Sequence, residues 1–294
     1  MGLALLLVVW LITFVSTFFF IKHPWWLPQS ATTYGPSIDA QFTFTFLTMG
    51  IVFVAAQVAL GLFVWKYRDR AHSTVYYSHG NLRLEAAWTV LTAVLFIGLN
   101  LMGEKIWAEA RFQGPAPGAL PVEVTGMQFQ WYFRYPGPDG TFGHSKPELE
   151  DPSTGNALGI DPDDPTAKDD IVTSTLVLPV NKQTDITLRA IDVIHDFFVP
   201  EFRFKQDAVP GLLIHMHFTP DRIGDYEIDC AELCGSGHYK MRAGVRVVSQ
   251  PDFDAFMKAP AQWLQTNPWQ APQVTAQHAH NAPQDAPQLR PENR

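Results

Sequence analysis

The chain has 294 residues, of which 47% are hydrophobic and 17% are charged, and its formal net charge is -8. This charge argues against a nucleic-acid partner, because phosphates call for clustered lysine and arginine, and two cysteines are too few for a disulfide framework. The apolar residues gather in the first hundred positions, which is typical of a membrane protein with a polar remainder.

The first apolar segment, residues 1–21, has no charged side chain. It is either a transmembrane helix or a signal segment. We favour a retained helix, because the segment lacks a basic n-region and its apolar run is long for the hydrophobic part of a signal peptide. No clear cleavage site follows it either.

Two further apolar runs predict a transmembrane hairpin over residues 40–105. Residues 42–65 carry no charge, and residues 86–102 lie between Glu85 and Glu104. Each run is close to the roughly 20 residues that a spanning helix needs. The connection between them carries four basic residues, which are Lys66, Arg68, Arg70 and Arg83. It is therefore predicted to be cytoplasmic, which places everything after the hairpin on the outer side.

Short strand-like runs punctuated by Pro, Gly, Asp and Asn fill residues 120–250, and they predict an antiparallel sandwich or a Greek-key barrel. The runs are VEVTG, STLVLPV, TDITLRAI, LLIHMHF and AGVRVVS. An insert at residues 143–170 is rich in Pro, Asp and Glu. It is predicted to be a solvated surface loop or, alternatively, an acidic docking lip for a basic partner.

Residues 251–264 predict a short amphipathic helix, and residues 265–294 predict a disordered tail rich in Pro, Gln and Ala. The tail histidines His278 and His280 are interpreted as incidental. The tail therefore contributes nothing to the expected site.

Both cysteines lie in the stretch CAELCGSGHYKM, where Cys230, Cys234, His238 and Met241 offer two thiols, an imidazole and a thioether. Thiolate and thioether ligands select copper, and imidazole suits copper as well. Zinc accepts cysteine and histidine but seldom methionine. On the outer side of a membrane, free thiols oxidise unless a metal protects them, so a disulfide is the plain alternative.

A second histidine is needed to balance such a site. His195 lies in an apolar strand-like run and is either a core histidine or a ligand. His215 and His217 compete with it, but two histidines on one face of a strand are also typical of an ordinary exposed strand.

These stretches resemble cytochrome c oxidase subunit II. CAELCGSGHYKM resembles that family's C-x-E-x-C-x-x-x-H-x-x-M loop, and VIHDFFVPEFRFKQDAVPG resembles the segment that carries its first copper-binding histidine. VTGMQFQWYFRYP resembles its aromatic stretch. The resemblance covers about residues 40–260 and implies a membrane-anchored all-β protein. A transmembrane hairpin would precede a cupredoxin-like Greek-key barrel. The first apolar segment, if retained, departs from the family as one extra helix beyond the usual pair.

The resemblance also implies a binuclear copper centre, CuA. Cys230 and Cys234 would bridge both coppers, and His195 and His238 would each bind one. Met241 would be a weak ligand, as would the backbone carbonyl of a further residue, Glu232. The Glu232 side chain would bind a magnesium ion shared with the catalytic subunit.

The implied function is electron entry into a haem-copper oxidase. The centre would take electrons from cytochrome c or an equivalent donor and pass them to the haem of catalytic subunit I. Reduction of oxygen and proton translocation would belong to the complex with its further subunits. The implied location is the bacterial plasma membrane, in contact with lipid, with the copper domain on the periplasmic side.

Two features depart from the family or need a second interpretation. Phe129 stands where the family has an electron-entry tryptophan directly after Gln128, and Trp131 matches the family's second aromatic residue. These aromatics have either a redox role or a packing role. Glu85 resembles the glutamate at the mouth of a proton channel, but an interfacial anchor is equally typical of that position.

Three other classes of protein compete with this interpretation. A quinol oxidase subunit II shares the fold but lacks the copper ligands, all of which are present here. A CuA subunit of a nitric-oxide reductase would carry the same site beside a different catalytic chain. A non-redox β-domain with structural zinc or a disulfide would leave the placement of Met241 unexplained.

Overall fold

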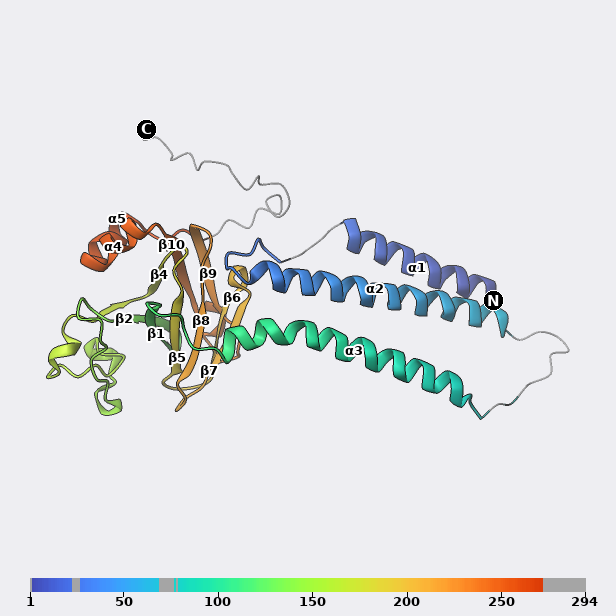
Figure 1. Cartoon of the computed structure of the whole chain (residues 1–294), viewed down its shortest axis with the longest axis horizontal. Coiled ribbons are helices and arrows are strands. Elements are labelled where there is room, and N and C mark those ends of the chain that lie inside the picture. The colour runs from blue at the N-terminus through green and yellow to red at the C-terminus, as the bar shows by residue number, and fades with distance from the viewer. Residues whose placement is uncertain (1, 23–26, 69–76, 78, 272–294) are drawn as a thin grey trace, which may run out of the picture. The chain divides into compact units, whose positions relative to one another are not determined.

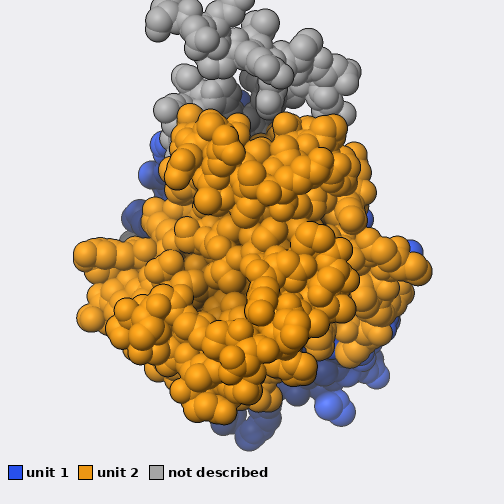
Figure 2. Space-filling model, turned by 90° about the vertical axis from the view of Figure 1, so that its left-hand side faces the viewer, with its two compact units in different colours: residues 1–26, 37–107 blue, residues 27–36, 108–294 orange. Residues whose placement is uncertain are grey.

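The computed structural model describes residues 2–22, 27–68, 77 and 79–271. The chain forms two compact units, coloured separately in Figure 2. One comprises residues 1–26 and 37–107, and the other comprises residues 27–36 and 108–294. The first unit is helical and the second contains all the strands of the described residues.

Three helices form the first unit (Figure 1): α1 (Gly2–Lys22), α2 (Gly35–Lys66) and α3 (Leu82–Arg111). All three are long and apolar enough to cross a membrane. The expected hairpin plus one extra helix is therefore confirmed. Arg70 of the predicted cytoplasmic loop lies outside the described residues.

Close contacts join neighbouring helices of this unit. The Trp10 indole of α1 lies against Gly61 of α2, and Trp10 Nε1 donates a hydrogen bond to the Val58 carbonyl at 3.4 Å. On α2, Gln41 Nε2 donates to the Leu99 carbonyl of α3 at 3.3 Å. Small residues at helix crossings and side-chain amides that bridge helices are both common in membrane bundles.

Ten strands build two five-stranded sheets, of order β3-β2-β1-β5-β8 and β4-β10-β9-β6-β7. Most neighbouring strands are antiparallel, but β1 pairs with β5 and β4 pairs with β10 in parallel. The sheets are thus mixed, whereas the sequence predicted antiparallel ones. The strands are β1 (Leu120–Met127), β2 (Gln130–Tyr135), β3 (Ile171–Thr173), β4 (Thr175–Pro179), β5 (Thr184–Ala190), β6 (His195–Val199), β7 (Phe204–Ala208), β8 (Ile214–Phe218), β9 (Gly224–Cys230) and β10 (Arg242–Val248).

Alternating side chains of these strands form the core between the two sheets. In β1, Val122 and Val124 are buried, and in β5 Ile186 and Leu188 are buried, while the residues between them are more exposed or polar. This period of two is the pattern that a strand with one buried face requires. The core holds the ends of β6 and β9 in place, and these ends carry the candidate site.

The insert at residues 143–170 is folded against the β-domain. Arg134 of β2 is 2% exposed and donates to Glu123 at 2.9 Å and to the carboxylate of Asp170. It also donates to the carbonyl of Gly143. A buried arginine with this many acceptors fixes both ends of the insert to the sheet.

The segment after β10 contains two short helices where one was expected. They are α4 (Gln250–Lys258) and α5 (Pro260–Thr266), and Pro260 separates them because proline has no backbone N–H to continue a helix. Beyond them, Trp269 packs on Gly244 and donates to the Tyr226 carbonyl at 2.8 Å. Residues 272–294, with His278 and His280, lie outside the described residues.

Candidate metal centre

Three neighbouring strands bring the predicted ligands together. His195 is the first residue of β6, Cys230 is the last residue of β9, and Met241 directly precedes β10. Because β9 pairs antiparallel with both β6 and β10, these positions lie at the same end of the sheet. The connection from β9 to β10 supplies Cys234 and His238.

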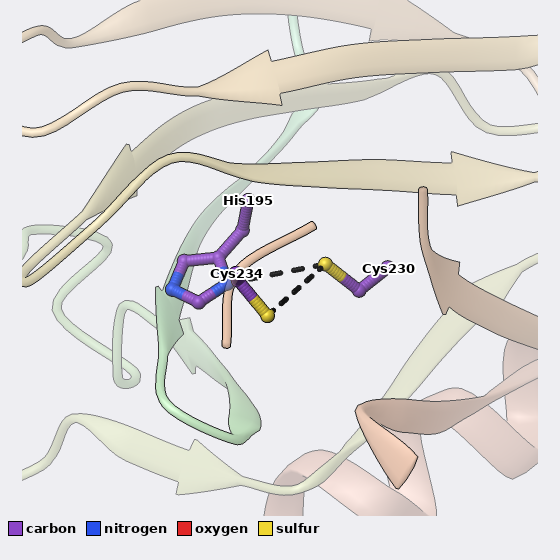
Figure 3. Close-up of side chains that lie close together, drawn as sticks. All are labelled: His195, Cys230 and Cys234. Carbon is purple, nitrogen blue, oxygen red and sulfur yellow. Dashed lines mark hydrogen bonds between the residues drawn. The ribbon is translucent and has the colours of Figure 1, made fainter. Parts of the chain in front are cut away.

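The two cysteine sulfurs form the middle of the site (Figure 3). Their Sγ atoms lie 3.8 Å apart and form no disulfide. His195 Nδ1 lies 3.9 Å from Cys230 Sγ, and the ligand atoms of these three buried residues all lie within 4.8 Å of one another. The arrangement favours His195 as a ligand over a plain core histidine.

The remaining predicted donors surround the same pair of sulfurs. Cys234 Sγ lies 3.7 Å from His238 Nδ1 and 3.8 Å from Met241 Sδ. The Glu232 carbonyl oxygen lies 3.2 Å from Cys230 Sγ, while the Glu232 side chain is exposed. Each sulfur therefore has one imidazole and one weaker donor beside it.

The donor set fits copper. Two thiols, two imidazoles and a thioether are ligands that copper accepts together, and a buried methionine is an uncommon zinc ligand. Burial, followed by the neighbouring Cys230 thiol, raises the pKa of Cys234 to about 11. The Cys234 thiol is therefore protonated until a cation takes the place of the proton.

Asp192 orients the His195 ring, and sequence reasoning missed it. His195 Nε2 donates to Asp192 Oδ1 at 2.8 Å, which leaves Nδ1 facing the sulfurs. Burial alone would raise the pKa of Asp192, but hydrogen bonds from the Gln128 N–H and from His195 outweigh it and lower that pKa. An aspartate three residues before a candidate ligand histidine was the available signal.

The two predicted electron-transfer aromatics occupy different environments. Trp131 is fully buried, and its ring packs edge-on against His195 with 5.9 Å between centroids. Phe129 is half-buried and lies against Gly235 and Gly237 of the cysteine loop. Of these two aromatics, only Phe129 reaches the surface.

Glu85 lies in the first turn of α3, where it caps the helix. Its Oε1 accepts a hydrogen bond from the Asn81 N–H at 3.3 Å, while Asn81 Oδ1 accepts from the N–H groups of Arg83 and Leu84. Such reciprocal capping stabilises a helix start. The role of Glu85 at a proton channel stays a prediction.

His215 and His217 lie on β8, which is an edge strand of the other sheet. His215 Nδ1 lies 3.3 Å from Thr187 Oγ1 of the neighbouring strand. The structure does not bring these histidines to the two cysteines.

Comparison with known proteins places the chain in one family. The family model for the periplasmic domain of cytochrome c oxidase subunit II matches residues 120–248. The alternative cytochrome c oxidase subunit 2 of Bradyrhizobium diazoefficiens is 36% identical over 258 residues, which cover 87% of this chain and 91% of that one. Cytochrome c oxidase subunit 2 of Thermostichus vulcanus is 30% identical, over 84% of this chain and 82% of the relative.

A solved structure was also found. The periplasmic domain of subunit II of cytochrome oxidase from Bradyrhizobium japonicum is 30% identical, with a TM-score of 0.37, and the match covers 50% of this chain and 98% of that one. Since the family model matches the β-domain and the curated relatives extend over more than four fifths of the chain, the chain belongs to the cytochrome c oxidase subunit II family.

Proposed function

We propose that this subunit carries a binuclear copper centre of the CuA type and transfers electrons through it. The observation that supports this best is the pair of sulfurs 3.8 Å apart without a disulfide, each beside the Nδ1 atom of a different histidine. A mononuclear copper site uses a single cysteine. A second thiol at the centre of the cluster is explained if both sulfurs are shared by two metals.

The residues divide the work of holding such a centre. Cys230 and Cys234 would bridge the metals, while His195 and His238 would bind one metal each. Met241 Sδ and the carbonyl of Glu232 would be weaker donors that tune the site. When bound, the copper pair supplies one-electron transfer, with the change in charge spread over two metals.

The subunit is anchored in the membrane by its helices, and its β-domain is periplasmic. The electron donor would therefore be a periplasmic protein, cytochrome c or a similar one. Phe129 would be an aromatic contact for that donor, because it covers the cysteine loop and is half-exposed. The electrons would pass to a haem of the catalytic subunit.

The proposal is tested on the full-length chain in detergent, purified apart from the catalytic subunit and reconstituted with copper. We expect two coppers per chain and an EPR spectrum in which one unpaired electron couples to both nuclei. One copper per chain, bound zinc, or a disulfide without metal would each contradict the binuclear centre. Zinc or a disulfide would return the domain to a structural role.

A further inference from the structure

The turn between β1 and β2 contacts both halves of the candidate centre. It consists of Gln128 and Phe129, between the end of β1 at Met127 and the start of β2 at Gln130. The halves are remote in sequence: one is the Asp192–His195 pair at the start of β6, and the other is the loop from Cys230 to Met241. The contacts of this turn carry an inference that rests on the proposed copper centre.

The main chain of the turn reaches the histidine half. The Gln128 N–H donates to Asp192 Oδ2 at 2.7 Å, and the other oxygen of the same carboxylate accepts from His195 Nε2 at 2.8 Å. Asp192 is thus held by hydrogen bonds on both of its oxygens. The orientation of the His195 ring depends on the position of this turn.

The side chain of the turn reaches the cysteine half. Gln128 Nε2 donates to the carbonyl oxygen of Cys234 at 2.5 Å. The orientation of the amide follows from the partner, because a carbonyl only accepts hydrogen bonds. The bond restrains the backbone of the residue whose sulfur lies closest to His238 and Met241.

The Phe129 ring adds a packing contact to this link. A Cβ atom at Gly237 would overlap the ring, and one at Gly235 would lie 3.1 Å from it. Gly235 has a φ of 137°, which side chains rarely adopt. The glycines therefore let the ring close directly onto the backbone of the cysteine loop.

We propose that Gln128 is a positioning residue of the copper centre, whose backbone N–H and side-chain amide tie the Asp192–His195 pair to the carbonyl of Cys234. It does not touch the metals. It fixes the separation between a ligand of one half and a ligand of the other. Removal of residues that hold metal ligands by hydrogen bonds lowers the affinity for the metal by about 10- to 100-fold.

The test compares Gln128→Met with Gln130→Met in the full-length, copper-loaded chain. Methionine has nearly the length of glutamine but donates no hydrogen bond. Gln130 is the matched control, because it is an exposed glutamine at the other end of the same turn. The readouts are the reduction potential, the EPR hyperfine pattern and the rate of copper loss to a chelator.

For Gln128→Met we expect a shifted potential, an altered hyperfine pattern and copper loss about tenfold faster than in the unmodified chain. Gln130→Met should leave all three unchanged. If both variants match the unmodified chain, or if both change alike, Gln128 has no positioning role.

Gln128→Glu provides a second variant in case the methionine variant does not fold. It keeps the length of the side chain, but an ionised carboxylate only accepts hydrogen bonds, so we expect a change in the same three readouts. If it behaves like the unmodified chain, the donated hydrogen bond is not needed. If the unmodified chain itself lacks the two-copper spectrum, the proposed function fails together with this inference.

Discussion

Like Cys230, Cys234 has three candidate donor atoms around its sulfur. Its sulfur lies 3.7 to 3.8 Å from the sulfur of Cys230, from Nδ1 of His238 and from the thioether of Met241. Met241 is fully buried, so its thioether is held in place by the core. Cys234 is proposed as a bridging ligand and Met241 as a weak donor, so substitutions of these two residues should affect copper binding differently.

We predict that Cys234→Ser abolishes the two-copper EPR pattern, since a hydroxyl is a poor replacement for a bridging thiolate. Copper content should fall from two per chain to one or none. Met241→Leu, a substitution of similar volume, should retain both coppers and shift the reduction potential. A two-copper spectrum in Cys234→Ser would contradict the bridging role. Complete loss of copper in Met241→Leu would contradict the assignment of Met241 as a weak ligand.

For individual residues, the sequence predicted the candidate ligands but not Asp192 and Gln128, which hold them in position. The donors of Cys230, Cys234, His238 and Met241 lie within twelve residues of one another. Residues this close in sequence stay close in space, so the sequence alone could group them. Gln128 acts through a turn more than 60 residues away from Asp192. The parallel pairing of β1 with β5, which ends at Gly126 and Ala190, brings Gln128 and Asp192 together.

Among the elements, the insert at residues 143–170 differs most from what its composition suggested. Its acidic residues are largely used within the domain: Asp164 accepts from the His144 N–H at 2.8 Å, and Asp161 pairs with Lys146 at 2.6 Å. Only two of its carboxylates belong to exposed residues, Glu148 and Asp163. The amino-acid composition gives the number of acidic residues in the insert but not their hydrogen-bond and ion-pair partners. The acidic docking lip stays a prediction.

Helix α1 offers a prediction about its own retention, which the contact between Trp10 and Gly61 makes testable. We expect a photo-crosslinking residue at position 10 to crosslink to the α2 segment around Gly61. In the Gly61→Leu variant the larger side chain would displace the crosslinking side chain at position 10, and the crosslink should be lost. Gly50→Leu is the control, since a Cβ at Gly50 has no atom within 4 Å.

The products of this crosslinking are read by mass spectrometry of the peptides. If residues 1–21 are removed as a signal segment, no variant gives a product that contains position 10. That result would contradict retention of α1. An unchanged crosslink in Gly61→Leu would contradict the packing of Trp10 on Gly61.

In the whole molecule, the membrane helices and the β-domain have separate tasks. The helices anchor the chain, and the β-domain holds proposed ligands from segments as far apart as His195 and Met241. A framework of this kind would keep the same ligand positions before and after the proposed electron transfer. With the proposed centre, the protein would do no bond chemistry of its own, and the chemistry of oxygen would belong to the catalytic subunit.

Glu232 is the residue through which the copper domain would meet that subunit. Its carbonyl faces Cys230 at 3.2 Å, whereas its carboxylate is exposed and is a suitable ligand for a hard cation such as magnesium. We therefore predict that Glu232→Gln removes magnesium from the assembled oxidase and leaves its copper unchanged, because the backbone carbonyl remains. Metal analysis of the purified complex measures both.

Glu227→Gln is the matched control for this substitution. Glu227 lies on β9 and pairs with Arg242 at 3.3 Å, so its loss should affect neither metal. Retention of magnesium in Glu232→Gln would show that its carboxylate does not bind the ion. The prediction requires that the backbone carbonyl of Glu232 acts on copper and its carboxylate on magnesium. A joint loss of copper and magnesium in Glu232→Gln would contradict this division, because it would show that the side chain also supports the copper loop.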